Sequence, residues 1–262
     1  MLRFGLIGET LGHSASVPIH RALYRLLGVE ADYALYPLPR ASFRGGAAAL
    51  LAELDGFNVT IPYKRDIMPL LDGLTPAAEA IGAVNTVLRR GDRRIGDNTD
   101  AEGFAAMLRL HGLDPAGQPC YILGTGGASA ACAAALRGLG AASVTLVSRR
   151  PAGGAIGYEA LAETGCGLLV NATPAGMLGQ ADRCPLTEGQ LRALLPRLTG
   201  VADVVYNPPR TPLTLAAQAA GVPACTGGAM LVAQAVAAER RWLGLPIPDD
   251  VIPALLEEVH LT

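Results

Sequence analysis

The segment Cys120-Tyr121-Ile122-Leu123-Gly124-Thr125-Gly126-Gly127-Ala128-Ser129 decides how the middle of this chain is expected to fold. An apolar strand pattern runs into a glycine turn, a helical pattern follows to Leu139, and a second strand pattern covers 143–147. This order is the context of a dinucleotide-binding unit, in which backbone N–H groups approach a pyrophosphate at the helix N-terminus. We therefore predict that Gly124 to Ala128 bind a dinucleotide, although Ser129 replaces the third glycine of the fingerprint.

The residues after the second strand of this unit indicate which dinucleotide is bound. NAD-binding proteins place an acidic residue there for the ribose 2′-hydroxyl. This chain instead has Ser148, Arg149 and Arg150, with no acid. Two guanidinium groups suit a 2′-phosphate, so the sequence favours NADP over NAD. The alternative reading is a pair of solvated arginines.

Lys64 is the only lysine among 21 basic residues, and it closes the stretch Asn58-Val59-Thr60-Ile61-Pro62-Tyr63-Lys64. Arginine keeps its proton at any workable pH, whereas a lysine can donate and accept one. The stretch begins with a strand pattern at 57–60, and ligands of open α/β sheets bind at the carboxyl ends of strands. We therefore predict that Lys64 is a catalytic acid/base, against the alternative of an ordinary surface lysine.

Other polar residues also lie where predicted strands and helices meet. Ser14 and Ser16 lie between a strand at 3–8 and a helix closed by Gly28, and Asp100 lies at the start of a helix over 101–111. Two hydroxyls at a helix N-terminus can hold a carboxylate, whereas the alternative role of each residue is helix capping. Ser42 is expected to cap a helix that runs to Leu54.

Bulk properties narrow the class of protein. A length of 262 residues suggests one or two domains, and half of the residues are hydrophobic. The net charge of −2 and the lack of a basic block argue against nucleic acid or a membrane surface as the main partner. No apolar run reaches the ~18 residues that a membrane span needs. Five cysteines, an odd number, fit reduced thiols in the cytoplasm better than disulfides or a zinc site, so no metal is expected.

Together these motifs resemble the shikimate dehydrogenase family over nearly the whole chain. The resemblance is carried by 58–64, 82–86, 97–100, 124–128, 171–174, 206–208 and 230–234. It implies NADPH-dependent reduction of 3-dehydroshikimate to shikimate, a step towards chorismate and the aromatic amino acids. It also implies an α/β fold with an N-terminal substrate domain (1–100 and 226–262), a Rossmann-type domain (101–225), and C-terminal helices that return to the first domain.

The resemblance also implies roles for individual residues. Ser14 and Ser16 look like the pair that holds the substrate carboxylate, and Lys64 and Asp100 resemble the catalytic pair. The other implied substrate-binding residues are Thr60, Asn85, Gln234 and Tyr206. The implied cofactor site adds Thr173, Gly227 and Met230, with Met230 packing beside the nicotinamide.

The sequence departs from the family pattern in three places. Val17 stands where the family has proline, which is displaced to Pro18, and Ser148-Arg149-Arg150 replaces the usual Asn-Arg-Thr. The segment from Ser148 to Gly167 is shortened, with room for one crossover helix. Two alternatives therefore stay open, a relative acting on quinate or an aminoshikimate, perhaps with NAD, and a non-catalytic nucleotide-binding homologue. The sequence does not distinguish a monomer from a homodimer.

Overall fold

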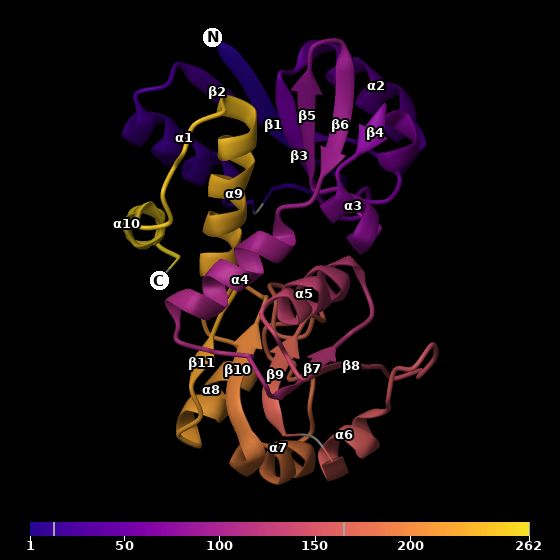
Figure 1. The fold of residues 1–262 in the computed structure, drawn as a ribbon, viewed down its shortest axis with the longest axis vertical. Coiled ribbons are helices and arrows are strands. Elements are labelled where there is room, and N and C mark those ends of the chain that lie inside the picture. Colours follow the sequence, from indigo (N-terminus) through magenta and orange to yellow (C-terminus); the bar gives the residue numbers. More distant parts are fainter. Residues whose placement is uncertain (13, 165, 262) are drawn as a thin grey trace. The chain divides into compact units, whose positions relative to one another are not determined.

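The computed structural model describes residues 1–12, 14–164 and 166–261 and shows an α/β protein with two compact units (Figure 1). Unit 1 comprises Met1–Thr99 and Gln234–His260, and unit 2 comprises Asp100–Ala233 with Leu261–Thr262. Each unit is built around its own sheet. The predicted α/β class is therefore confirmed, and the C-terminal helices return to the unit that contains the N-terminus.

Unit 1 contains a six-stranded mixed sheet in the order β2-β1-β3-β5-β6-β4. Its elements are β1 (Leu2–Gly8), α1 (Ser16–Leu27), β2 (Ala31–Pro37), η1 (Arg40–Ser42), α2 (Phe43–Glu53), β3 (Gly56–Val59), η2 (Met68–Leu70), β4 (Gly73–Leu74), α3 (Pro76–Ile81), β5 (Thr86–Arg90), β6 (Arg93–Asp97), most of α9 (Gly228–Leu243), and α10 (Val251–Glu258). Strand β1 pairs in parallel with β2 and β3, whereas β5 is antiparallel to β3 and β6. The first and third strands therefore deliver their following residues to one edge.

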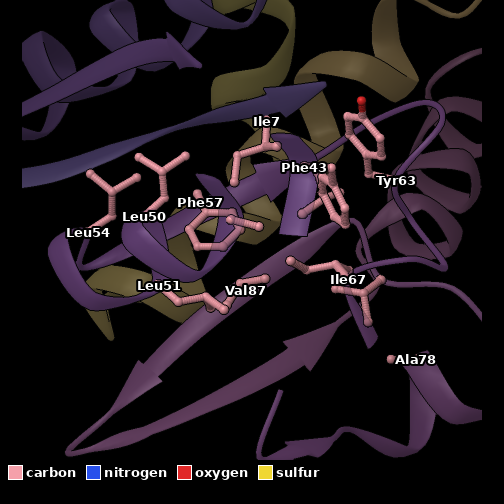
Figure 2. Close-up of a cluster of buried hydrophobic side chains, with 13 residues drawn as sticks. Ile7, Phe43, Leu50, Leu51, Leu54, Phe57, Tyr63, Ile67, Ala78 and Val87 are labelled. Carbon is pink, nitrogen blue, oxygen red and sulfur yellow. The ribbon is translucent and has the colours of Figure 1, made fainter. Parts of the chain in front are cut away.

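One face of this sheet packs against α2 and α3. Figure 2 shows Ile7, Phe57 and Val87 from the strands beside Leu50 of α2 and Leu54, which directly follows α2, all in one buried cluster. The close-up also places the rings of Phe43 and Tyr63 next to each other, and these rings stack with centroids 4.0 Å apart.

The opposite face of the sheet packs against α1 and α9. Side chains alternate along a strand, so Phe4 and Leu6 of β1 point away from the cluster that contains Ile7. Phe4 stacks on Trp242 of α9 with ring centroids 4.7 Å apart, and Tyr24 of α1 and Tyr33 of β2 complete this second cluster. The later half of α1 and the C-terminal end of α9 are thereby fixed on the same face.

Unit 2 contains a five-stranded parallel sheet in the order β11-β10-β9-β7-β8. Its elements are α4 (Asp100–Leu110), β7 (Pro119–Leu123), α5 (Gly127–Gly138), β8 (Ser143–Val147), α6 (Tyr158–Thr164), β9 (Gly167–Asn171), α7 (Glu188–Leu194), η3 (Leu195–Arg197), β10 (Leu198–Asp203), α8 (Pro212–Ala219), β11 (Ala224–Cys225), and the first residues of α9. The predicted strand, glycine turn, helix and strand over 120–147 are confirmed.

The shortened segment after β8 keeps one trace of a further strand. Ile156 forms an isolated parallel bridge with Val147, in which Ile156 N donates to Leu146 O and Ser148 N donates to Ile156 O, both at 2.9 Å. With this bridge counted beside β8, the strand order is that of the classic dinucleotide-binding fold, whose third strand is here reduced to a single residue. Helix α6 then provides the crossover that the segment length predicted.

Two helices of unit 1 begin differently. Thr75 caps α3 through its side chain, which accepts a hydrogen bond from Ala78 N, with Pro76 in the first turn. The expected cap at Ser42 is wrong, because Ser42 Oγ donates to Pro39 O and makes no cap bond to α2. Among the described ranges, no helix combines the length and the apolar character that crossing a membrane requires.

Candidate active site

Ser14 and Ser16 form a hydroxyl pair at the N-terminus of α1. Ser14 Oγ donates to Ser16 Oγ (3.1 Å) and accepts from Ser16 N (3.2 Å). The N-cap of α1 is Ala15, which offers no capping side chain. Two hydroxyls at the N-terminus of a 12-residue helix suit an anionic group, because the positive end of the helix dipole lies there.

Asn85 lies at the centre of a buried polar cluster in unit 1. Its Nδ2 donates to Thr99 Oγ1 (3.0 Å) and to Gln234 Oε1 (3.4 Å). Its Oδ1 accepts from Thr99 N (2.8 Å) and from Thr86 Oγ1 (2.9 Å). The structure therefore brings the predicted residues Asn85 and Gln234 together and adds two buried threonines to them.

Asn58, which was not among the predicted site residues, contacts this cluster. Asn58 is buried in the middle of β3, where its Oδ1 accepts from Tyr33 OH (2.8 Å). Its Nδ2 donates to Asn85 O (3.2 Å) and Thr86 Oγ1 (3.1 Å). A polar amide between the apolar residues Phe57 and Val59 of a fully buried strand was the signal that could have revealed it.

Thr60 and Lys64 are held by the tight turn that follows β3. Thr60 N donates to Ile7 O (2.9 Å), Tyr63 N donates to Thr60 O (2.9 Å), and Val84 N donates to Lys64 O (2.8 Å). Tyr63 OH donates to Leu38 O, which fixes the turn from its other side. The half-buried Lys64 thus has a firmly held backbone on the carboxyl side of β3. Asp100 is buried at the start of α4, in unit 2.

The glycine turn of unit 2 has the shape that a bound pyrophosphate needs. Gly124 has φ +109°, and a Cβ there would lie 3.1 Å from Ala172 O and 3.2 Å from Ser129 Oγ. Gly126 is the N-cap of α5 without a side-chain cap bond, and added Cβ atoms at Gly126 and Gly127 would meet nothing within 4 Å. The first N–H groups of a 12-residue helix thus face an uncrowded turn, which fits a dinucleotide phosphate.

Ser148, Arg149 and Arg150 follow β8 at the same edge. Leu123 of β7 is in register with Val147, so this segment begins beside the glycine turn. Ser148 Oγ donates to Arg150 O and accepts from Arg150 N, both at 3.1 Å, which folds the segment into a tight bend. The two arginines are exposed, and no acidic residue stands between β8 and Ile156. These features fit a 2′-phosphate.

The remaining predicted residues of unit 2 follow the next strands. Asn171 Oδ1 at the end of β9 accepts from Thr173 N (3.1 Å) and Thr173 Oγ1 (2.7 Å). Tyr206 follows β10 and is half-buried. Gly227 follows β11, where its N donates to Val205 O (2.8 Å), and Met230 is buried in the first turn of α9. The predicted residues Thr173, Tyr206, Gly227 and Met230 therefore lie on the carboxyl side of a parallel sheet.

Asp203 at the end of β10 ties these loops together. It accepts hydrogen bonds from Asn171 Nδ2 (2.9 Å), Thr211 Oγ1 (2.8 Å) and Val205 N (3.0 Å). Burial nevertheless raises the pKa of Asp203 from the ordinary 3.8 to about 6, and these hydrogen bonds oppose the increase. Within the described ranges, no group of three or more His, Cys, Asp or Glu side chains could hold a metal ion.

Comparison with known proteins shows similarity along nearly the whole chain. Residues 6–87 match a family described as the shikimate dehydrogenase substrate binding domain. A shikimate dehydrogenase (NADP(+)) of Citrifermentans bemidjiense is 39% identical, with 94% of this chain and 91% of the relative covered. The chain is also 39% identical to the enzyme of the same name from Chlorobium phaeovibrioides, covering 98% and 96%.

Two solved structures illustrate the range of the fold. Shikimate 5-dehydrogenase of Thermus thermophilus, in complex with NADP(H) and shikimate, has a TM-score of 0.88 at 33% identity, covering 99% of this chain and 100% of the other. The ligand-free 5-ketofructose reductase of a Gluconobacter strain has a TM-score of 0.80 at 30% identity, covering 98% of each.

Proposed function

Because the chain belongs to the shikimate dehydrogenase family, we propose that it is an NADP-dependent oxidoreductase that interconverts 3-dehydroshikimate and shikimate. The observation that carries this proposal is the 39% identity, over 94% of the chain, to a relative with that name. The two groups of polar residues at the carboxyl sides of the two sheets support it. In this assignment most of the substrate-binding residues belong to unit 1, and the cofactor-binding residues belong to unit 2.

The cofactor is assigned to the glycine turn and its neighbours. Gly124, Thr125, Gly126, Gly127 and Ala128 offer backbone N–H groups to the pyrophosphate. Arg149 and Arg150 bind the 2′-phosphate, and Ser148 holds their backbone in its bend. Thr173, Gly227 and Met230 line the nicotinamide end. When bound, NADPH supplies the hydride that reduces the ketone.

The substrate is assigned to the polar groups of unit 1 and to Tyr206. Ser14 and Ser16 hold the carboxylate, aided by the positive end of the α1 dipole. Thr60, Asn85 and Gln234 hold the ring hydroxyls, since amides and hydroxyls both donate and accept hydrogen bonds. The bond between Asn85 and Gln234 supports their action on one ligand.

Lys64 and Asp100 are assigned to proton transfer. Reduction of a ketone places negative charge on its oxygen, and the Lys64 ammonium stabilises that charge and donates the proton. Asp100 orients the lysine in this scheme. In the reverse direction, Lys64 accepts the proton of the substrate hydroxyl.

A comparison of steady-state rates tests the proposal. Shikimate and quinate are each oxidised with NADP+ and with NAD+, and 5-ketofructose is offered for reduction with NADPH. We expect the highest kcat/KM for shikimate with NADP+. A preference for quinate with NAD+ would identify a relative with another substrate. No binding of NADP+ in calorimetry would instead identify a homologue without catalysis.

A further inference from the structure

A fully buried acid–base pair lies in unit 1 and takes no part in the proposed chemistry. His20 Nδ1 on α1 and Glu239 Oε1 on α9 are 2.6 Å apart, and both side chains are 0% exposed. In the part of the chain that the structure describes, His20 Nε2 and Glu239 Oε2 have no hydrogen-bond partner. Apolar residues of similar volume often give equal or higher stability than such a pair. Stability alone therefore does not explain this pair.

The pair fixes the ring of Tyr33. The imidazole of His20 stacks on the Tyr33 ring with centroids 3.8 Å apart and an interplanar angle of 6°. Trp242 lies on another side of the imidazole, with ring centroids 5.7 Å apart. The bond to Glu239 prevents rotation of the imidazole, so the plane against which Tyr33 packs is fixed.

Tyr33 sets the direction of a hydrogen-bond relay. Burial raises the pKa of Tyr33 well above the ordinary 10.0, and the charge of nearby Glu239 raises it further. The hydroxyl therefore stays protonated and donates to Asn58 Oδ1, which leaves Asn58 Nδ2 to donate to Thr86 Oγ1. Thr86 Oγ1 in turn donates to Asn85 Oδ1, and Asn85 Nδ2 is then directed at Gln234 Oε1.

The same pair also joins the two helices that carry substrate residues. His20 lies one turn after Ser16 on α1, and Glu239 lies five residues after Gln234 on α9. Their bond connects segments that are 219 residues apart in sequence. Their bond therefore links both helices that carry proposed substrate residues to the ring at the head of the relay.

We propose that His20 and Glu239 are positioning residues for substrate binding, which hold Tyr33 so that the relay presents Asn85 and Gln234 in one fixed orientation. This inference rests on the proposed function, because it assigns substrate to Asn85 and Gln234. It predicts an effect on the KM of shikimate and little effect on kcat or on the KM of NADP+, since neither residue belongs to the cofactor unit or to the catalytic pair.

A double-mutant cycle tests the proposal. Glu239→Leu removes the bond to His20 at similar volume, and Tyr33→Phe removes the relay donor but keeps the stacked ring. We expect each change to raise the KM of shikimate roughly tenfold. For comparison, a 1 Å misplacement can lower a reaction rate about a hundredfold. The double variant is expected to be no worse than either single variant, because both changes interrupt one path. Glu258→Gln, which breaks the exposed pair with Arg25, is the matched control.

The outcomes separate three conclusions. A normal KM of shikimate in Glu239→Leu, with only the melting temperature changed, would show that the pair is merely structural. Additive effects in the double variant would also overturn the proposal. If Glu239→Leu does not fold, His20→Leu combined with Glu239→Leu removes both polar groups and should still show the raised KM. Failure of the unaltered protein to oxidise shikimate would instead reject the proposed function itself.

Discussion

The proposed proton transfer by Lys64 can be tested directly with one substitution. Lys64→Arg keeps the positive charge and the hydrogen-bond donors but removes a proton that can be transferred. We expect turnover to fall by about 10²–10⁴, the usual contribution of a general acid. The fold should be unchanged, because Val84 N bonds to the backbone carbonyl of residue 64. Steady-state kinetics and circular dichroism measure the two effects.

Arg65 provides the control for this exchange. It is exposed and directly follows Lys64, so Arg65→Lys changes a basic side chain at almost the same place. That variant should keep nearly full turnover. Near-normal turnover in Lys64→Arg would refute the acid/base role and leave only a charge effect.

Asp203 makes stability depend on pH. Its folded-state pKa of about 6 lies above the ordinary 3.8, so the folded protein holds this proton more tightly than the unfolded chain. The stabilisation is therefore complete below about pH 4 and is lost as the pH rises through about 6, with a span of roughly 3 kcal/mol. Asp203→Asn should lack this loss, because the introduced amide can accept from Asn171 and donate to Thr211.

Urea denaturation measured from about pH 4 to about pH 7 checks this prediction. The free energy of unfolding of Asp203→Asn should rise relative to the unaltered protein across this range. A constant difference between the two proteins would show that Asp203 does not titrate there. Asp203→Ala is the contrasting variant, since it leaves Asn171 Nδ2 and Val205 N without their acceptor.

Helix α2 offers a comparison of two neighbouring glycines. An added Cβ at Gly45 meets nothing within 4 Å, whereas one at Gly46 would lie 2.6 Å from Leu38 Cδ2. Gly45→Ala should therefore raise the free energy of unfolding by about 0.5–1 kcal/mol, the helix-propensity difference. Gly46→Ala should gain less or lose stability, because the partly buried Leu38 must move. Thermal unfolding of the two variants measures this difference in stability. An equal increase in the free energy of unfolding of both variants would contradict the structure.

Elements with local signals were predictable from the sequence, and those set by distant pairing were not. The apolar run at 120–123, the glycine turn and the following helix identified one unit, because periodicity and glycine act locally. Strand β4, at Gly73–Leu74, was not predicted, because it exists through its pairing with β6. Ser42 is a residue type that favours helix N-caps, yet its hydroxyl donates to Pro39 O instead of capping α2.

The same distinction applies to the candidate site. Asn85 and Gln234 could be named from motifs, and the structure shows them bonded to each other. The contributions of Thr86 and Asn58 depend on which face of each strand is buried, and that of Thr99 depends on the turn between β6 and α4. The order of these residues in the sequence shows neither. The contact between His20 and Glu239 was missed entirely, because the two residues are 219 positions apart and each is followed by an arginine, so neither looks buried in the sequence.

At the scale of the whole molecule, each ligand should protect its own unit. Bound NADP+ is expected to slow amide hydrogen exchange at 124–130 and 148–150, and shikimate to slow it at 14–16 and 85–86. Each ligand at 100 times its Kd should raise the free energy of unfolding by about 2.7 kcal/mol. Hydrogen exchange with mass spectrometry measures the protection. Protection of 124–130 by shikimate alone would contradict the assignment of ligands to units.

The division of the chain into units has a consequence for how the protein is made. The chain leaves unit 1 after Thr99 and returns to it at Gln234, so unit 2 is inserted within unit 1. During translation all strands of both sheets emerge before α9 does. The face of the first sheet that carries Phe4 and Tyr33 thus stays without Trp242 until the segment after Gln234 has been synthesised. During synthesis, unit 2 can therefore begin to fold while unit 1 is still unfinished.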